Sequence, residues 1–175
     1  GLEATFATMV AGPFVLTDGL LPLLEASGDG RVINVVSGGM YGQALPLDDL
    51  QFERGTFDGT RAYARAKRAS TALMREWSRR SRGNVRFDAM HPGWADTPGL
   101  AESLPGFYDL MRPVLRSPAE GADTITWLAT DASDDRPRGR LYLDRRPRPY
   151  DRVPATRLSA QDRRRLWESV VSLTD

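Results

Sequence analysis

The residues best suited to chemistry are a tyrosine and a lysine four positions apart. Tyr63 and Lys67 stand in the segment Tyr-Ala-Arg-Ala-Lys, inside an alanine- and arginine-rich run that is typical of a helix. Residues four apart share one face of a helix, so the hydroxyl and the ammonium emerge together. An ammonium beside a phenol favours the phenolate, as a general acid/base requires. The pair predicts proton transfer, although tyrosines on amphipathic helices more often simply pack.

The lysine of this pair has no counterpart elsewhere in the chain. Lys67 is the single lysine, and every other cationic side chain is an arginine. Lysine offers a compact ammonium with rotatable donors, whereas arginine offers a rigid planar fork. This usage indicates that an ammonium is required at position 67.

Composition limits the classes of function. The 175 residues suit one domain, and 41% hydrophobic and 27% charged residues are ordinary for a globular protein. The net charge of +1 argues against nucleic acid as a partner. The absence of cysteine excludes thiolate chemistry and fits a cytoplasmic location, and one histidine makes a metal site improbable. No uninterrupted apolar run reaches the roughly 20 residues of a membrane span, so none is predicted.

Helices and strands are expected to alternate along the chain. Apolar positions at helical spacing mark 2–24, with a kink or break at Gly12-Pro13. Apolar runs predict strands at 31–37 and 85–90, each buried on both faces. A helix at 60–81 and a turn at 81–84 lie between them. This order is typical of half of a doubly wound α/β sheet.

The second half of the chain continues the pattern. Scattered bulky residues at 99–116 predict a lid or short helices. Ser117-Pro118-Ala119-Glu120 is a capping box that should start a helix running to about Thr130. A third strand is expected at 139–144. The Arg/Pro-rich remainder, 145–175, should end in a helix capped by Ser159, with Leu166, Val170 and Leu173 on one face.

Three motifs occur in a fixed order on these elements: Asn34-Val35-Val36-Ser37, Tyr63-x-x-x-Lys67, and His91-Pro92-Gly93 followed by Thr97. Together they resemble the short-chain dehydrogenase/reductase family, and the long Ser37-to-Tyr63 spacing is similar to its retinol-dehydrogenase-like branch. The resemblance implies an α/β fold, namely the C-terminal part of a Rossmann-like parallel sheet flanked by helices. It covers residues 1–144 as a partial domain, followed by the extension 145–175.

The resemblance also implies roles for individual residues. The catalytic group would be Ser37, Tyr63 and Lys67. The residues that hold NAD or NADP would be Tyr63, Lys67, Pro92, Gly93, Trp94 and Thr97. The activity would interconvert a hydrophobic alcohol and its carbonyl, in a pocket formed by apolar residues of 94–111 with Met40 and Tyr41. Helices 2–24 and 60–81 would pair two copies into a homo-oligomer.

Two departures from the family pattern support a competing interpretation. No glycine-rich strand–turn–helix for the pyrophosphate occurs here, so we expect a truncated chain with an unpaired sheet edge. Met9 stands where the family has an asparagine that supports a proton relay, and a thioether donates no hydrogen bond. The alternative function is therefore a non-catalytic remnant or an interaction module that binds no cofactor.

Other interpretations of single residues stay open at this stage. Ser37 alone could bond its own loop, and Thr97 could cap the turn before Pro98. His91 suggests a Ser–His hydrolase, but a nucleophile elbow needs glycine two residues before the serine, where Val35 stands.

Overall fold

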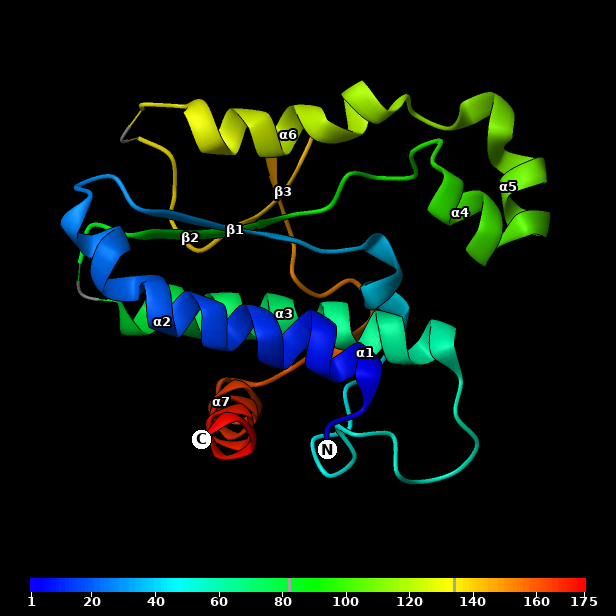
Figure 1. The fold of residues 1–175 in the computed structure, drawn as a ribbon. Coiled ribbons are helices and arrows are strands. Elements are labelled where there is room, and N and C mark those ends of the chain that lie inside the picture. The colour runs from blue at the N-terminus through cyan, green and yellow to red at the C-terminus, as the bar shows by residue number, and fades with distance from the viewer. Residues whose placement is uncertain (82, 134) are drawn as a thin grey trace.

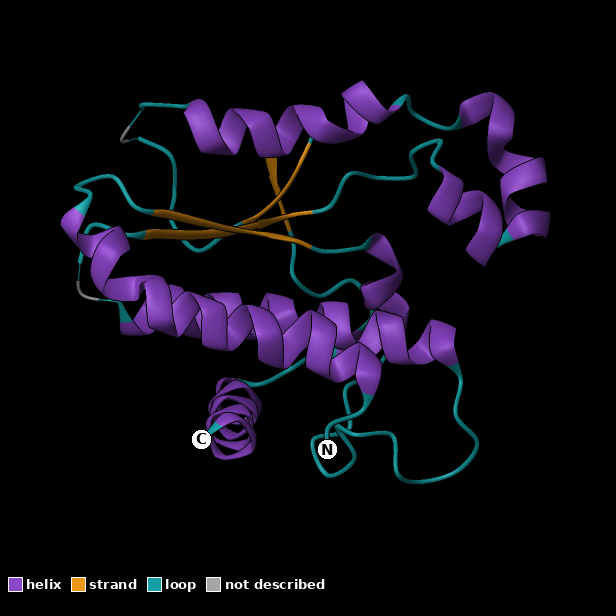
Figure 2. Ribbon diagram, in the orientation of Figure 1, coloured by secondary structure: helices purple, strands orange, loops and turns teal. Residues whose placement is uncertain are grey.

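Four strands form one sheet with helices on both of its faces (Figures 1 and 2). The computed structural model describes residues 1–81, 83–133 and 135–175. The predicted α/β class, with a mostly parallel sheet flanked by helices, is confirmed. Arg82 of the predicted turn lies outside the described residues.

The sheet has the strand order β1-β2-β3-β4. β1 (Arg31–Val35), β2 (Arg86–Met90) and β3 (Leu141–Leu143) are parallel neighbours. β4 (Arg146–Arg148) returns antiparallel to β3, and sequence reasoning did not predict it. The two residues that join β3 to β4, Asp144 and Arg145, both have φ 55°. Such left-handed residues are what a two-residue hairpin turn requires.

The strands predicted at 31–37 and 85–90 are both expected to be buried on two faces, and only one of them is. β2 is buried along its whole length, as predicted. The prediction that 31–37 is buried on both faces is wrong, because β1 is half-buried and Val35 is 44% exposed. Among the described residues β1 pairs with β2 alone, so the predicted unpaired sheet edge is confirmed.

The N-terminal helix runs without a break past Gly12-Pro13. α1 (Ala4–Phe6) leads through a π-helical turn (Ala7–Ala11) into α2 (Gly12–Ala26). Proline has no N–H and crowds the carbonyl four residues before it, and the wider π turn absorbs this conflict. The freed Met9 carbonyl instead accepts a hydrogen bond from Ser70 Oγ at 2.8 Å. Of the predicted kink or break, the break does not occur, and the irregularity takes the form of this π turn.

This same helix bears on the expectation that the chain has no membrane span. The 23 residues Ala4–Ala26 have a mean hydropathy of 1.5, and 17% of the most apolar window is buried. By length and composition alone, such a helix is apolar enough to cross a membrane. Phe6, Val10 and Phe14 nevertheless belong to the hydrophobic core, as in a helix that packs on a sheet.

α3 (Gly59–Arg80) is the predicted helix 60–81, and Asp58 caps it by accepting from the Arg61 N–H. Its packing face is buried, and at its far end Trp77 stacks on Phe87 with ring centroids 5.6 Å apart. Trp77 also meets Trp167 edge-on at 4.6 Å. These contacts make α3 the centre of the core.

α7 (Ala160–Thr174) supplies Trp167 and lies across α3 (Figure 1). Ser159 caps it as predicted, in a capping box with Asp162. Leu166 and Val170 are fully buried, but Leu173 is exposed, contrary to the predicted face. A second copy packing on this side of α3 would have to share the surface with α7.

The remaining elements surround the carboxyl ends of the strands. A 3₁₀ helix, η2 (Gly38–Gly42), follows β1. Short helices α4 (Pro98–Ser103), α5 (Pro105–Met111) and η3 (Arg112–Val114) follow β2, as predicted for 99–116. α6 (Pro118–Thr130) begins with the predicted capping box and covers the other face of the sheet (Figure 2). A further 3₁₀ turn, η4 (Pro154–Thr156), precedes α7.

Candidate active site

Tyr63 and Lys67 lie one turn apart in the N-terminal half of α3, at the carboxyl edge of the sheet. Lys67 Nζ is 5.6 Å from the centroid of the Tyr63 ring and donates a hydrogen bond to the Val35 carbonyl at 3.0 Å. Tyr63 is 38% exposed, and its hydroxyl has no hydrogen-bond partner among the described residues. Burial lowers the pKa of Lys67. The phenol is thus accessible beside a half-buried ammonium.

Ser37 lies two residues beyond the carbonyl that Lys67 binds. It caps η2, and its Oγ accepts a hydrogen bond from the Gly39 N–H at 3.3 Å. The hydroxyl proton is still free to be donated. α3 is fastened to η2 by Arg68, whose Nη1 donates to the Met40 carbonyl at 3.3 Å. Ser37 and the Tyr63–Lys67 pair are therefore held on adjoining elements.

Met40 does not belong to the predicted substrate pocket. It is fully buried beneath η2, where it packs in the core against α3. An apolar side chain directly after two glycines looked available from sequence, but the 3₁₀ turn points it inward. Tyr41, the next residue, is only half-buried and donates a hydrogen bond from its hydroxyl to the Pro149 carbonyl at 2.9 Å.

The loop after β2 is held by a single arginine. Arg116 pairs with the loop backbone on both sides of Ala95, donating its N–H to Trp94 O at 2.9 Å and accepting from Asp96 N at 2.8 Å. Its side chain spans Gly93, which has φ +77°, and a Cβ on Gly93 would lie 2.9 Å from Arg116 Nε. Glycine is required there both by backbone conformation and by this contact.

Asp144 fixes the guanidinium that spans the loop. Arg116 Nη1 and Nη2 donate to the two Asp144 carboxylate oxygens at 2.5 and 3.0 Å. The same contact lowers the pKa of Asp144, with the Arg116 hydrogen bond as the main cause. Sequence reasoning missed both residues, because they are 28 positions apart and belong to separate elements. A bidentate pair of this kind fixes orientation as well as charge.

The other predicted loop residues take local roles in the structure. Thr97 caps α4, its Oγ1 accepting from the Leu100 N–H at 3.3 Å. Trp94 is 42% exposed and packs on Phe107, with centroids 4.5 Å apart. These two rings form an apolar wall beside the loop.

His91 lies between the two loops but does not pair with the serine. It is 6% exposed, and neither ring nitrogen has a hydrogen-bond partner among the described residues. A Cβ added to Gly38 would lie 3.9 Å from the imidazole, which places the ring against the Ser37 loop. Burial, with the charges of nearby arginines, lowers the pKa of His91 to about 4. The neutral ring packs edge-on against Tyr41 at 6.0 Å.

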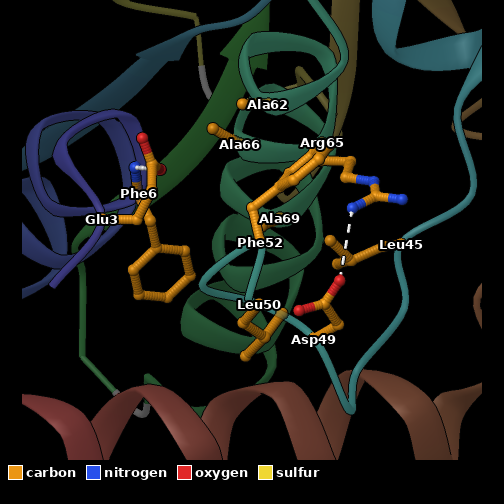
Figure 3. Close-up of a pocket in the computed structure, with 10 residues that line it drawn as sticks. All are labelled: Glu3, Phe6, Leu45, Asp49, Leu50, Phe52, Ala62, Arg65, Ala66 and Ala69. Carbon is orange, nitrogen blue, oxygen red and sulfur yellow. Dashed lines mark hydrogen bonds and ion pairs between the residues drawn. The ribbon is translucent and has the colours of Figure 1, made fainter. Parts of the chain in front are cut away.

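A small hollow lies on a different face of α3 (Figure 3). It is bounded by Phe6, by the loop residues Leu45 and Leu50, and by the alanines of α3. Arg65 reaches across it to Asp49, with Nη1 and Oδ2 3.9 Å apart. Its volume of about 10 Å³ is that of a single water, so it holds no substrate. It marks where the loop before α3 packs, away from Tyr63.

Comparison with known proteins places this geometry in a family, although no protein-family model matches the chain. Human dehydrogenase/reductase SDR family member 12 is 48% identical over 148 residues, which are 84% of this chain and 46% of that protein. The chain belongs to the short-chain dehydrogenase/reductase family. Human retinol dehydrogenase 14 is 32% identical over 154 residues, covering 82% of this chain and 45% of its own length. The chain spans about half the length of the curated relatives it matches.

A solved structure agrees with this assignment of the short-chain dehydrogenase/reductase fold. The crystal structure of an uncharacterised protein from Mycobacterium paratuberculosis superposes with a TM-score of 0.71 at 26% identity. The match covers 99% of this chain and 59% of that one. The whole described chain, including β4 and α7, therefore follows an arrangement found in a longer protein.

Proposed function

We propose that the complete protein is an NAD(P)-dependent oxidoreductase that interconverts an alcohol and its carbonyl. The observation that carries the proposal is the Tyr63–Lys67 pair, an exposed phenol with a half-buried ammonium 5.6 Å from its ring. The pair faces the edge where Ser37 and the Pro92–Gly93 loop also end. Family membership adds support, since the relatives are named as dehydrogenases or reductases.

Each of the three polar groups has a distinct role in this proposal. The Tyr63 hydroxyl gives a proton to the substrate oxygen in reduction and takes it back in oxidation. The Ser37 hydroxyl, already oriented by the Gly39 N–H, donates a hydrogen bond to the same oxygen. The Lys67 ammonium favours the phenolate that remains after proton transfer. These groups orient the substrate and move the proton.

The residues present also fit the nicotinamide end of a dinucleotide. Lys67 Nζ donates one of its three N–H groups to the Val35 carbonyl, so two remain for ribose hydroxyls. Gly93 carries no side chain, and Arg116 and Asp144 fix the backbone beside it. Lys67 and the loop from Pro92 to Thr97 would hold the nicotinamide end, with Trp94 beside it. The nicotinamide, when bound, supplies or accepts the hydride.

A fluorescence titration with NADH and NADPH tests the proposal on the protein encoded by the complete reading frame. We expect a dissociation constant in the micromolar range, as is usual for such ligands. Lys67→Ala should weaken binding about tenfold because it removes a charged donor, whereas Tyr63→Phe should bind within about twofold of wild type. Arg164→Gln, an exposed change on α7, is the control. Binding that is absent at millimolar concentrations of both cofactors would contradict the proposal.

The second candidate is an interaction module that binds no cofactor. It is favoured by the outward face of the Ala4–Ala26 helix, where Val15, Leu16 and Leu23 are exposed. Met9 in place of the family asparagine points the same way, because its side chain cannot relay a proton. Absence of cofactor binding, combined with a stable complex in light scattering, is the result that this candidate predicts.

A further inference from the structure

Basic side chains gather beside the Ser37 loop without a part in the proposed chemistry. Arg152 stacks on Tyr41, its guanidinium carbon 5.0 Å from the ring centroid. Tyr41 belongs to η2, which begins directly after Ser37, and it packs edge-on against His91. The segment after β4 thereby brings a positive charge to the edge of the candidate active site.

The acidic side chains nearby are already engaged by other arginines. Asp144 accepts both hydrogen bonds from Arg116, and it also forms an ion pair with Arg148, whose Nη2 is 3.9 Å from Asp144 Oδ2. Asp151, next to Arg152, is bound at 2.6 Å by a buried arginine of α3. Within the described ranges no ion pair engages Arg152, and Arg148 Nε is buried without a hydrogen-bond partner.

Arg152 and Arg157 line an open hollow of about 350 Å³ together with residues 149–151, 153 and 154, of which Asp151 is held by the buried arginine of α3. Arg152 and Arg157 are both exposed there, so their guanidinium groups are available to a ligand. The low pKa of His91 has burial as its first cause and the charges of Arg152, Arg148 and Arg116 as its next. Three arginines thus bring positive charge close to His91, and Asp144 opposes them. Guanidinium groups bind carboxylate and phosphate oxygens in pairs.

We propose that the substrate carries an anionic group, a carboxylate or a phosphate, which Arg152 binds while its carbonyl or alcohol faces Tyr63. The inference rests on the oxidoreductase function proposed above and names the substrate class of that site. The Trp94–Phe107 wall takes the apolar body of such a molecule. The substrate is thus an amphipathic carbonyl compound instead of a wholly hydrophobic one.

A matched pair of aldehydes tests this charge requirement. 4-Formylbenzoate and its methyl ester share the ring and the reacting carbonyl and differ in the anionic group. In NADH- or NADPH-linked reduction by the full protein, we expect kcat/KM for the acid to exceed that for the ester about tenfold. Arg152→Gln should lower the value for the acid about tenfold and leave the ester within about twofold. Arg164→Gln on α7 is the matched control and should change neither.

The failure of this inference is distinguishable from failure of the proposed function. Equal turnover of acid and ester by wild type would overturn the anionic substrate and leave the oxidoreductase intact. No turnover of either would count against the oxidoreductase, and melting experiments then decide the anion site alone. A ligand that binds the folded state raises its melting temperature. A rise with 4-formylbenzoate that is absent with the ester and lost in Arg152→Gln supports the site, and equal curves overturn it.

Discussion

Two regions of α3 differ in how completely their side chains are satisfied: the packing face, and the N-terminal end that carries Tyr63 and Lys67. On the packing face, Ala66, Ala69 and Trp77 are buried against the N-terminal helix, the sheet and α7. At the N-terminal end, Tyr63 has no described partner for its hydroxyl, and Lys67 uses one donor out of three. Under the proposed function, stability depends on the packing face and chemistry on the N-terminal end.

The largest expected effect is at the N-terminal end of α3, on the rate of turnover. Tyr63→Phe should reduce turnover about 10²- to 10⁴-fold, because it removes the proton donor and leaves the ring in place. The free energy of unfolding should change by less than about 0.5 kcal/mol, as for an exposed group. Steady-state assays and urea unfolding measure the two quantities on the same preparations.

Tyr142→Phe is the matched control for that substitution. Tyr142 is buried on β3 and donates its hydroxyl to the Pro137 carbonyl at 2.9 Å. Loss of this hydrogen bond should lower the free energy of unfolding by about 1 kcal/mol and leave turnover unchanged. If Tyr63→Phe instead retained full activity, or destabilised the fold as Tyr142→Phe does, the division between the packing face and the N-terminal end of α3 would be wrong.

The next effect belongs to the packing face. Trp77→Ala should lower the free energy of unfolding by about 3–5 kcal/mol, because it empties the space between Phe14, Phe87 and Trp167. Trp94→Ala, the same substitution at an exposed site on the loop, should cost less than about 1.5 kcal/mol. Urea titrations followed by far-ultraviolet circular dichroism compare them. Equal losses would show that the two tryptophans are equally integrated into the core.

Protonation of His91, which lies beside the candidate active site, should affect the stability of the fold. Its folded pKa of about 4 lies below the unfolded value of about 6.5, so only the unfolded chain takes up this proton between those values. Stability should therefore fall as pH decreases from 6.5 to 4, by up to about 3 kcal/mol. Because the chain has one histidine, His91→Gln should remove this component and flatten the pH curve.

Unfolding of wild type and His91→Gln at pH 7.0, 5.5 and 4.5 measures that difference. The carboxylates that titrate near pH 4 are common to both proteins, so they cancel in the comparison. Parallel curves would mean that the imidazole is hydrated in solution and that this edge of the site is open to water.

Local signals predicted the elements whose causes are local. The capping residues Ser117 and Ser159 and the length of α3 all follow from residues a few positions apart. The site residues Arg116 and Asp144 could not be predicted in this way. Their pairing depends on the β3–β4 hairpin, whose Arg-Pro-Arg strand has little intrinsic tendency to form a sheet.

Burial was also hard to predict, for a related reason. The runs 31–37 and 85–90 are similarly apolar, yet β2 has neighbours on both sides and β1 has one. Met40 looked like a pocket residue, and the η2 turn buried it. In both cases the outcome depends on partners distant in sequence, which the composition of a segment does not specify.

The smallest expected effect tests whether α7 belongs to the packing face or folds by itself. Ser159→Ala removes the cap of α7 and should cost about 1 kcal/mol. Ser172→Ala, at an exposed position of the same helix, should lie within about 0.5 kcal/mol of wild type. Because Leu166 and Val170 are buried against the core, the loss in Ser159→Ala should shift one cooperative transition of the whole chain. A separate early transition, seen as a change at Trp167 before the sheet melts, would mean that 145–175 is a detachable extension and that the packing face of α3 is complete without it.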